Sequence, residues 1–245
     1  MIAAITAGGR VDGQLASEIG TDVKALAPFA GGKLVDASIG AARLAGARRV
    51  AVIGGQAVRA YCSGRVDAVI DEASDGRENL RRAIELGADE PLLLLTSDLP
   101  FVTGDATHDF VTRAQQYDVA LPLADEAEYL RSYPGAPPHI TRVGNERVAN
   151  GSVVYFGAGI APRVLDAAQR LFAARKSLFA MASLLGPALL LRFLFNRLTI
   201  EDIERRAGRL LGIRARAVRG ASPALCYDVD TYDDYRYAVE RFAAG

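Results

Sequence analysis

Two acidic sites, far apart in the chain, have residue types suited to divalent-cation chemistry. Asp98 follows the apolar run Leu92–Leu95, and Pro100 stops the chain from continuing as a strand. Asp228 and Asp230 precede a C-terminal helical pattern, and residues two apart in an extended segment point the same way. A carboxylate at the carboxyl end of a buried parallel strand lies where open α/β sheets bind ligands. Magnesium prefers one or two carboxylates together with phosphate oxygens and water.

Both acidic sites also have a simpler interpretation. Asp98 alone is equally typical of a residue that caps a turn. The acidic residues before the last helix are typical of a solvated helix start, where carboxylates complement the helix dipole. We assign Asp233 and Asp234 to that structural role, and expect Asp230 to act in a site only if the chain supplies phosphate-binding partners.

A glycine-rich turn and two lysines are the candidate phosphate-binding partners. Ala7-Gly8-Gly9-Arg10 follows the apolar segment Ile2–Thr6, and glycine allows backbone to approach phosphate oxygens closely. The basic residues are almost all arginine, and two of the three lysines, Lys24 and Lys33, fall within ten residues. A compact ammonium retained in an arginine-rich chain suggests a specific role.

Composition narrows the function class. The 245 residues include 29 basic and 29 acidic side chains, so no polycationic surface indicates nucleic-acid binding. Cys62 and Cys226 lack CxxC spacing, so we expect reduced thiols and no zinc site. The N-terminus has no basic region before its apolar run and is not typical of a signal peptide. A cytoplasmic setting is expected.

The first half of the chain alternates between strand and helix patterns, which predicts a parallel sheet with right-handed crossovers. Between the first strand and Lys24, residues 11–22 are expected to form a loop. The predicted strands are Ile2–Thr6, Arg49–Gly54, Val66–Asp71, Leu92–Leu95 and Val119–Leu121. One predicted helix begins near Leu34. Three others cover Gln56–Tyr61, Asp75–Leu86 and Ala106–Gln116.

The second half is expected to carry two insertions into a single domain spanning residues 1–245. The first, at about 122–160, has an irregular or edge segment at Asp125–Pro138, then strands at His139–Arg142 and Ser152–Phe156 that would help to hold a second substrate. The second, at about 163–212, is helical. The chain then ends with a strand at Ile213–Val218 and a helix ending at Phe242.

Within the helical insertion, Arg163–Arg175 has the spacing of an amphipathic helix. Leu178–Leu198 is strongly apolar, but Gly186 and Pro187 interrupt it, so it is not typical of a membrane span. We expect a buried helix pair or an oligomer contact there, with contact to lipid less favoured. Thr199 and Asp202 have the spacing of a capping box for a helix ending at Leu211, before Gly212.

The ordered set of motifs resembles a known family. The segments are Thr6–Arg10, Lys24–Leu26, Ala30–Lys33, Leu95–Pro100 and Asp228–Thr231. In this order they resemble the GT-A-like nucleotidyltransferases, closest to the MobA-like NTP transferases, which include molybdenum-cofactor guanylyl- and cytidylyltransferases, and to sugar-1-phosphate nucleotidyltransferases. The resemblance implies an α/β fold, a Rossmann-like three-layer αβα sandwich with a mixed, mostly parallel sheet.

The resemblance also implies roles for individual residues. Lys24 would neutralise phosphate charge, with Lys33 as a helper, and Asp98 and Asp230 would hold Mg²⁺. The nucleotide-binding set would be Ala7, Gly8, Gly9 and Arg10 around the base and triphosphate, Gly76 and Asn79 at the base, and Ser97. Asn150 and Gly151 fall near the acceptor-binding loop of related enzymes.

The implied activity is transfer of an NMP from an NTP, with GTP one candidate, to a phosphorylated small-molecule acceptor, with release of pyrophosphate. The acceptor would be a molybdenum-cofactor precursor or a sugar or alcohol phosphate, and a homo-oligomer is compatible with the family. Where relatives carry an Arg-Met pair, this chain reads Val11-Asp-Gly-Gln14, and the segment between Gly9 and Lys24 is longer.

Alternative functions remain open at the level of sequence. A GT-A glycosyltransferase using a nucleotide-sugar shares the fold, but usually has Asp-x-Asp where this chain has Ser97-Asp-Leu-Pro100. A catalytically eroded NTP-binding protein is favoured by the missing Arg-Met pair. A dehydrogenase is excluded because no G-x-G-x-x-G follows the first strand.

Overall fold

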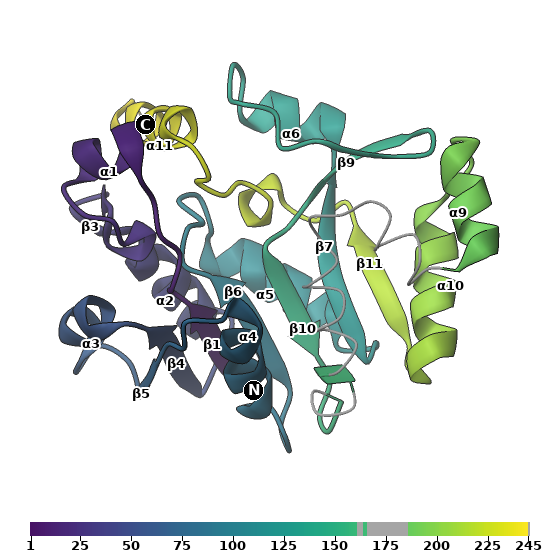
Figure 1. Ribbon diagram of the computed structural model, residues 1–245, viewed down its shortest axis with the longest axis horizontal. Coiled ribbons are helices and arrows are strands. Elements are labelled where there is room, and N and C mark those ends of the chain that lie inside the picture. The colour runs from purple at the N-terminus through teal and green to yellow at the C-terminus, as the bar shows by residue number, and fades with distance from the viewer. Residues whose placement is uncertain (161–163, 166–185, 245) are drawn as a thin grey trace.

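A mixed nine-stranded sheet forms the centre of the molecule (Figure 1). The computed structural model describes residues 1–160, 164–165 and 186–244. The strands of the main sheet are β1 (Ile2–Thr6), β4 (Arg49–Gly54), β5 (Ala68–Asp71), β6 (Leu92–Thr96), β7 (Val119–Asp125), β8 (Thr141–Val143), β9 (Glu146–Asn150), β10 (Val153–Phe156) and β11 (Ala215–Arg219). Their order is β5-β4-β1-β6-β10-β7-β9-β8, with β11 also paired to β7.

The sheet is parallel through its first half. β1 pairs in parallel with β4 and β6, β4 with β5, and β11 with β7. β10 runs antiparallel between β6 and β7. The carboxyl ends of β1 and β6 therefore meet at one edge, where the residues after each strand become neighbours.

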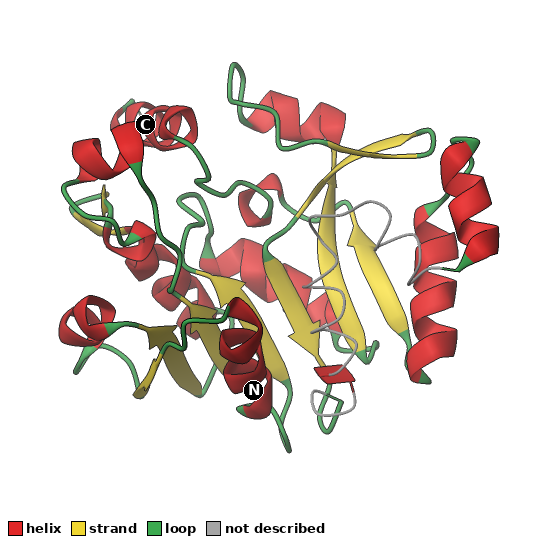
Figure 2. Ribbon diagram, in the orientation of Figure 1, coloured by secondary structure: helices red, strands yellow, loops and turns green. Residues whose placement is uncertain are grey.

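Helices cover both faces of the sheet (Figure 2). They are α1 (Gly13–Ile19), α2 (Leu34–Leu44), α3 (Gln56–Cys62), α4 (Gly76–Glu85), α5 (Gly104–Ala114), α6 (Glu126–Ser132), α9 (Pro187–Leu194), α10 (Ile200–Leu211) and α11 (Tyr232–Ala243). Short elements are the 3-10 turns η1 (Lys24–Leu26) and η2 (Pro223–Leu225) and the small hairpin of β2 (Pro28–Phe29) and β3 (Gly32–Lys33).

The alternation of side chains along β1 produces two cores. Ala3 and Ile5 pack into a large cluster on one face, together with residues of α2 and α5. Ile2 and Ala4 pack on the other face, together with Ala83 and Ile84 of α4 and with β6. A strand buried on both faces reads as a continuous apolar run, which explains the sequences of β1 and β6. The predicted α/β class and mixed, mostly parallel sheet are confirmed.

Three local expectations are wrong. The segment 11–22 contains helix α1 rather than only a loop, and the segment expected to be irregular contains α6. The hairpin is formed by β8 and β9, whereas β10 lies inside the main sheet between β6 and β7. Ser152–Phe156 was predicted to flank a hairpin-like insertion, but Val153, Tyr155 and Phe156 are buried within the main sheet.

The helical insertion is described only in part. The predicted helix at Arg163–Arg175 lies almost entirely outside the described residues, as do residues 178–185 of the apolar stretch. The capping box at Thr199 and Asp202, the helix through Leu211 and the left-handed stop at Gly212 are confirmed. Leu191–Arg197 is exposed, so this part of the apolar stretch is not buried within the chain, and the oligomer contact stays a prediction. No helix in the described part has both the length and the apolar composition needed to span a bilayer.

Candidate active site

The loop after β1 is closed by backbone hydrogen bonds that bring Lys24 to the edge of the sheet. The N–H of Lys24 donates to the carbonyl of Gly9 at 3.0 Å, and the N–H of Val11 donates to that of Asp22 at 2.9 Å. Arg10 and Val23 form an antiparallel bridge at the same place. Helix α1 is thereby carried on a loop whose base is fixed, and η1 starts with Lys24 beside the end of β1.

The ammonium of Lys24 lies between the two carboxylates singled out in the sequence. Its Nζ is 2.8 Å from Oδ2 of Asp98 and 2.9 Å from Oδ1 of Asp230. Lys24 and Asp98 have side chains only 13% exposed, whereas that of Asp230 is 63% exposed. Three residues separated by up to 206 positions therefore form one cluster at the carboxyl edge of the sheet.

Electrostatics keep this lysine charged. Burial by itself would lower the pKa of Lys24, but Asp98 and Asp230 outweigh it and raise the pKa above its ordinary value. The N–H of Val229 donates to the carbonyl of Asp98 at 3.0 Å, which fixes the segment carrying Asp230 against the end of β6. The cluster is therefore held by backbone as well as by charge.

The two carboxylates fit a divalent cation that also binds phosphate. Oδ1 of Asp98 is buried and has no hydrogen-bond partner among the described residues, which leaves one lone-pair-bearing oxygen for another ligand. No group of three or more His, Cys, Asp or Glu side chains with metal-binding geometry occurs in the described part of the chain. A site with two carboxylates suits Mg²⁺, which completes its shell with phosphate oxygens and water.

A second set of polar residues lies behind the cluster. Ser152 Oγ donates to Oδ2 of Asp228 at 2.9 Å, and His139 Nδ1 lies 3.2 Å from Oδ1 of Asp228. The other ring nitrogen of His139 is 3.0 Å from Oδ1 of Asp234. Burial and then the charges of Asp98 and Asp230 raise the pKa of Asp228. Asp228 therefore contributes to the electrostatics of the cluster.

Sequence reasoning gave no role to Ser152 or His139. One sequence feature indicated that Asp228 belongs to the site, namely its position two residues before Asp230. His139 lies in a proline-rich segment and is part of no motif. Asp234 takes the structural role expected for it, because its Oδ2 accepts hydrogen bonds from the N–H of Asp230 and from Thr231 at the start of α11.

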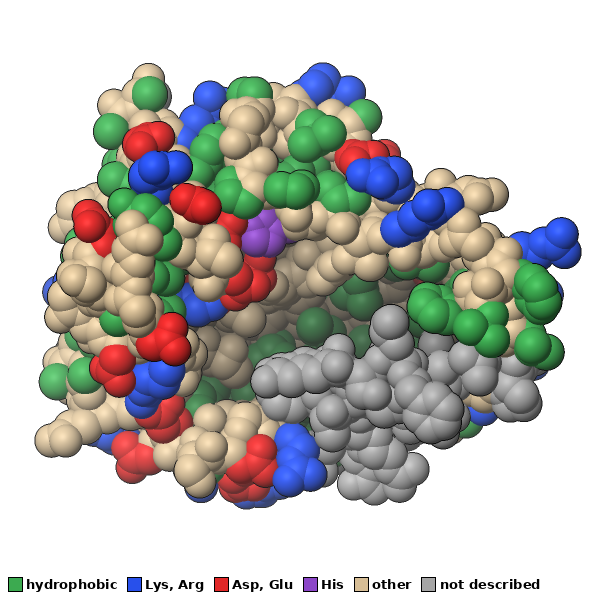
Figure 3. Space-filling model, turned by 45° about the horizontal axis from the view of Figure 1, so that its top comes forward, with side chains coloured by type: hydrophobic (Ala, Val, Ile, Leu, Met, Phe, Trp, Pro, Cys, Tyr) green, Lys and Arg blue, Asp and Glu red, His purple; other side chains and the backbone are tan. Residues whose placement is uncertain are grey.

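Two members of the cluster, Lys24 and Asp98, line a pocket of about 450 Å³. A space-filling view of the molecule shows a hollow with acidic and basic side chains at its edge (Figure 3). The lining residues come from β1, β4, β6 and β10, from the segments next to them, from η1 and from the start of α4: Thr6, Gly8, Gly9, Lys24, Ile53, Gly76, Asn79, Leu80, Leu94, Leu95, Thr96, Ser97, Asp98, Ser152 and Val154. The pocket therefore gathers Gly8, Gly9, Lys24, Gly76, Asn79, Ser97 and Asp98 from the predicted set.

The glycine loop passes tightly over an acidic side chain. A Cβ at Gly8 would lie 2.4 Å from Oε2 of Glu72, so a side chain at this position would displace that carboxylate. Arg10 forms an ion pair with Glu72, lies 3.6 Å from Asp22, and donates to the carbonyl of Gly8 at 3.1 Å. Glu72, which the sequence did not single out, therefore holds Arg10 at the back of the loop.

At the other end of the pocket, Gly76 opens α4 and Asn79 lies one turn later. Both polar atoms of the Asn79 side-chain amide are used locally: Nδ2 donates to the carbonyl of Ala73 at 3.0 Å, and Oδ1 accepts from the N–H of Ala73 at 2.6 Å. Asn79 thus shapes the wall of the pocket through the loop before α4. Ala7 is fully buried, and its N–H donates to the carbonyl of Ile53 at 2.8 Å.

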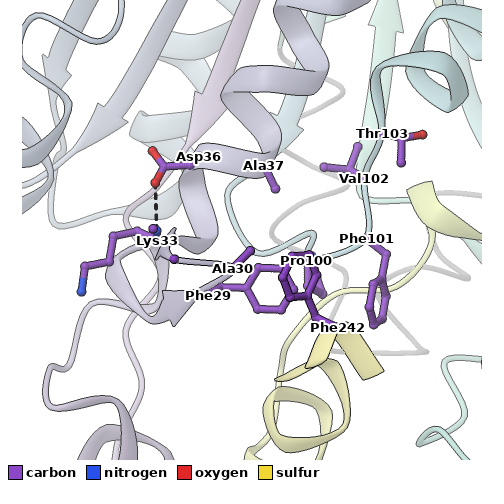
Figure 4. Close-up of a pocket in the computed structure, with 12 residues that line it drawn as sticks. Phe29, Ala30, Lys33, Asp36, Ala37, Pro100, Phe101, Val102, Thr103 and Phe242 are labelled. Carbon is purple, nitrogen blue, oxygen red and sulfur yellow. Dashed lines mark hydrogen bonds between the residues drawn. The ribbon is translucent and has the colours of Figure 1, made fainter. Parts of the chain in front are cut away.

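Lys33 lies at a different pocket, of about 630 Å³, next to the β2–β3 turn (Figure 4). Its N–H donates to Oδ2 of Asp36 at 2.8 Å, and its side chain points away from Phe29, Pro100 and the other apolar residues of that pocket. The structure therefore brings Lys24, but not Lys33, to the carboxylates of the cluster.

Asn150 and Gly151 lie at the end of β9. Oδ1 of Asn150 accepts from Thr141 Oγ1 at 3.2 Å. A Cβ at Gly151 would lie 2.4 Å from Cγ of Pro122 and 2.7 Å from the carbonyl oxygen of Leu225. Close packing therefore accounts for the glycine at 151, and neither residue lines the pocket that contains Asp98.

Comparison with solved structures shows the same fold in several proteins, two of which are described as transferases. A hypothetical transferase from Thermus thermophilus has a TM-score of 0.82 at 26% identity, covering 95% of this chain and 98% of that one. A nucleotidyl transferase from Methanothermobacter thermautotrophicus has a TM-score of 0.59 at 17% identity, covering 99% and 97%. A manganese complex of Rv0371c from Mycobacterium tuberculosis has a TM-score of 0.53 at 19% identity, covering 98% and 97%.

A search of curated protein sequences gives no match. The family model for the MobA-like NTP transferase domain matches residues 3–198. This range contains the glycine loop, Lys24 and Asp98, while Asp230 joins them from the C-terminal segment beyond it. The chain therefore belongs to the MobA-like NTP transferase family.

Proposed function

We propose that the protein is a Mg²⁺-dependent nucleotidyltransferase that moves an NMP from an NTP to a phosphorylated small-molecule acceptor. The observation that carries this proposal is the position of the Lys24 ammonium between Asp98 and Asp230, at the edge of a pocket that Gly8 and Gly9 of the glycine loop also line. A buried cation and two carboxylates beside a glycine loop match the requirements of polyphosphate chemistry.

In the proposed reaction, a phosphate oxygen of the acceptor attacks the α-phosphorus of the NTP. The bond from that phosphorus to the bridging oxygen breaks, and pyrophosphate leaves with the electron pair. No protein nucleophile is required. Catalysis then consists of alignment and charge stabilisation in a fixed site.

The residues of the chain divide this work. Lys24 supplies a positive charge that is fixed before substrate binds, because two carboxylates hold its Nζ. Asp98 and Asp230 would hold the cation, which when bound neutralises phosphate charge and orients the oxygens. The backbone of Gly8 and Gly9 would pass beside the triphosphate, and the wall formed by Gly76 and Asn79 would receive the base.

The acceptor is proposed from the family alone. MobA-like and sugar-phosphate nucleotidyltransferases use phosphorylated acceptors, so a molybdenum-cofactor precursor or a sugar or alcohol phosphate is the class to test. A divalent cation is supported by the two-carboxylate cluster and by the manganese complex of one structural neighbour. GTP is one candidate nucleotide, and it is to be compared with the other three NTPs.

The test is a two-step screen on the wild-type protein. The four NTPs are first compared for thermal stabilisation with and without Mg²⁺, and the stabilising nucleotide is then incubated with phosphorylated acceptors while pyrophosphate is measured. We expect stabilisation to need both NTP and cation, and pyrophosphate release to need an acceptor. Cation-dependent NTP binding with no pyrophosphate release from any acceptor would favour the eroded NTP-binding alternative. A parallel incubation replaces the NTP with nucleotide-sugars, and activity only with a nucleotide-sugar would favour a glycosyltransferase.

A further inference from the structure

Helix α9 and the residues after it expose a contiguous apolar surface far from the cluster in sequence. Leu191, Phe193, Leu194 and Phe195 are all exposed, and Phe195 reaches 71%. Scattered exposed leucines need no explanation, but four large apolar side chains within five residues form the kind of patch that marks an interaction site. We call Leu191–Arg197 the α9 surface.

The charges around the α9 surface are unbalanced. Residues 186–212 contain five arginines, Arg192, Arg197, Arg205, Arg206 and Arg209, against the acids Glu201, Asp202 and Glu204. The side chain of Asp202 is only 5% exposed and binds both Arg192 and Arg205. Glu204 is also largely buried, where it bonds Arg216 and the N–H of Ala217.

Asp202 and Glu204 therefore face inward, whereas the side chain of Glu201 is 50% exposed. No described carboxylate pairs with Arg197 or Arg209, both of which are exposed. Glu201, the remaining acid of the segment, is engaged by Arg219. Hydrophobic side chains with adjacent basic side chains are visible at this end of the molecule, where α9 lies in Figure 1 (Figure 3).

We propose that the α9 surface docks the protein on a lipid bilayer that contains anionic headgroups. The phenylalanine and leucine side chains would enter the boundary between headgroups and acyl chains, and the arginines would pair with lipid phosphates, as interfacial amphipathic helices do. α9 has eight residues and is about 12 Å long, so the contact is with one leaflet only.

A second copy of the chain is the competing occupant, and charge argues against it. A two-fold dimer through this surface would bring the same patch of both subunits together. Exposed arginines would then face exposed arginines, with no free exposed acid on the segment to balance them. An anionic lipid surface supplies the missing negative charge and also accepts the apolar side chains.

Vesicle co-sedimentation tests the proposal. Wild-type protein is mixed with vesicles of phosphatidylcholine alone or of equal parts phosphatidylcholine and phosphatidylglycerol, at low and high salt. We expect binding to the anionic vesicles, weaker binding to phosphatidylcholine, and loss of binding as salt rises. The double variant Phe193→Glu/Phe195→Glu is expected to bind more than about tenfold more weakly, because it removes two rings that would enter the bilayer and adds negative charge.

A matched control separates this surface from general hydrophobicity. Leu130 is an exposed leucine on α6, and Leu130→Glu is expected to bind like the wild type. Should the double variant fail to fold, judged by circular dichroism, the single variant Arg197→Glu takes its place, with weaker binding to anionic vesicles expected. The proposal would be overturned if the wild-type protein did not bind anionic vesicles, or if a folded α9 variant bound them like the wild type. A dimer in solution that the α9 variant dissociates, without vesicle binding, would assign the surface to the second copy instead.

Discussion

Lys24 is the residue on which the electrostatics of the cluster depend. Its ammonium separates Asp98 from Asp230, and Asp228 lies close enough for its pKa to be raised by both. Two carboxylates therefore contact one buried ammonium, and their charges act on a third carboxylate, that of Asp228. Any second cation that binds Asp98 and Asp230 must share or replace the contacts that Lys24 makes.

Replacing Lys24 by methionine is expected to destabilise the protein by about 1–3 kcal/mol, because it leaves the Asp98 carboxylate partly buried and uncompensated. The melting temperature should fall, and millimolar Mg²⁺ should restore more of it in the variant than in the wild type. Thermal unfolding with and without Mg²⁺ measures both effects. Lys33→Met, at the other pocket, is the control and should change stability by less than about 0.5 kcal/mol. Equal responses of the two variants would contradict the role assigned to Lys24.

His139 gives the cluster region a pH dependence. The hydrogen bond to Asp234 raises its pKa above the ordinary value, although burial opposes this. A group whose pKa is raised on folding stabilises the protein fully below its unfolded pKa, about 6.5 for histidine, and this contribution is lost as pH rises through the raised value. The difference in unfolding free energy between wild type and His139→Gln should therefore shrink as pH increases from 6 to 9, measured by urea titration. A difference that grows over this range would contradict the assignment.

At the scale of elements, caps and tight contacts determine where the site-bearing segments lie. Helix α10 starts at a reciprocal capping box, in which Thr199 Oγ1 accepts from the N–H of Asp202 and Asp202 accepts from the N–H of Thr199. The same arrangement at Thr231 and Asp234 starts α11, directly after Asp230. The cap of α11 therefore also fixes the backbone of the second acidic site.

Removing the N-terminal cap of α10 tests the first of these two capping boxes. Thr199→Ala should lower stability by about 1 kcal/mol, because a buried N–H loses its partner. In a chain of this length that corresponds to a fall in melting temperature of about 2–4 °C. Thr112→Ala, an exposed site within α5, is the matched control and should leave the melting temperature unchanged. If both threonines behave alike, the cap has no energetic role.

Gly151 makes a similar prediction for the β9–β10 connection. Gly151→Ala should destabilise the protein by about 1–3 kcal/mol, since its Cβ would press on the Leu225 carbonyl and Pro122. Asn150→Ala should cost less, because its side chain is exposed and bonds only Thr141. Chemical denaturation of the two variants distinguishes them. A stable Gly151→Ala protein with weakened acceptor use would instead support the acceptor-binding role implied by the family.

At the scale of the whole molecule, the sequence was sufficient for the sheet and for part of the site. β1, β4 and β6 are buried on both faces, so their apolar runs and the alternating helices identified a parallel sheet. The positions of Asp98 at a strand end and of Lys24 after a glycine turn followed from the same logic. The structure joins them with Asp230 through long-range contacts that no local pattern encodes.

The parts that sequence did not predict depend on tertiary context. Glu72 pairs with Arg10, and His139 links Asp228 to Asp234, but neither residue lies in a recognisable motif. Helix α6 lies in a segment rich in acidic residues, tyrosine and proline, where local propensity favours irregular structure. The exposure of the α9 surface does not follow from hydrophobicity alone, because an apolar sequence gives no indication of whether protein or lipid covers it.

The central claim is that Lys24, Asp98 and Asp230 act together on an NTP. Its most direct test is the rate of pyrophosphate release by Lys24→Ala, Asp98→Ala and Asp230→Ala, with the NTP and acceptor found in the screen and saturating Mg²⁺. Asp233→Ala is the control, since Asp233 is exposed and its one ion pair among the described residues is with Arg236 on the same helix. We predict a loss of at least about 100-fold in each of the three variants and a wild-type rate in the control. Normal Mg²⁺-dependent turnover by a folded Asp98→Ala protein would contradict the account.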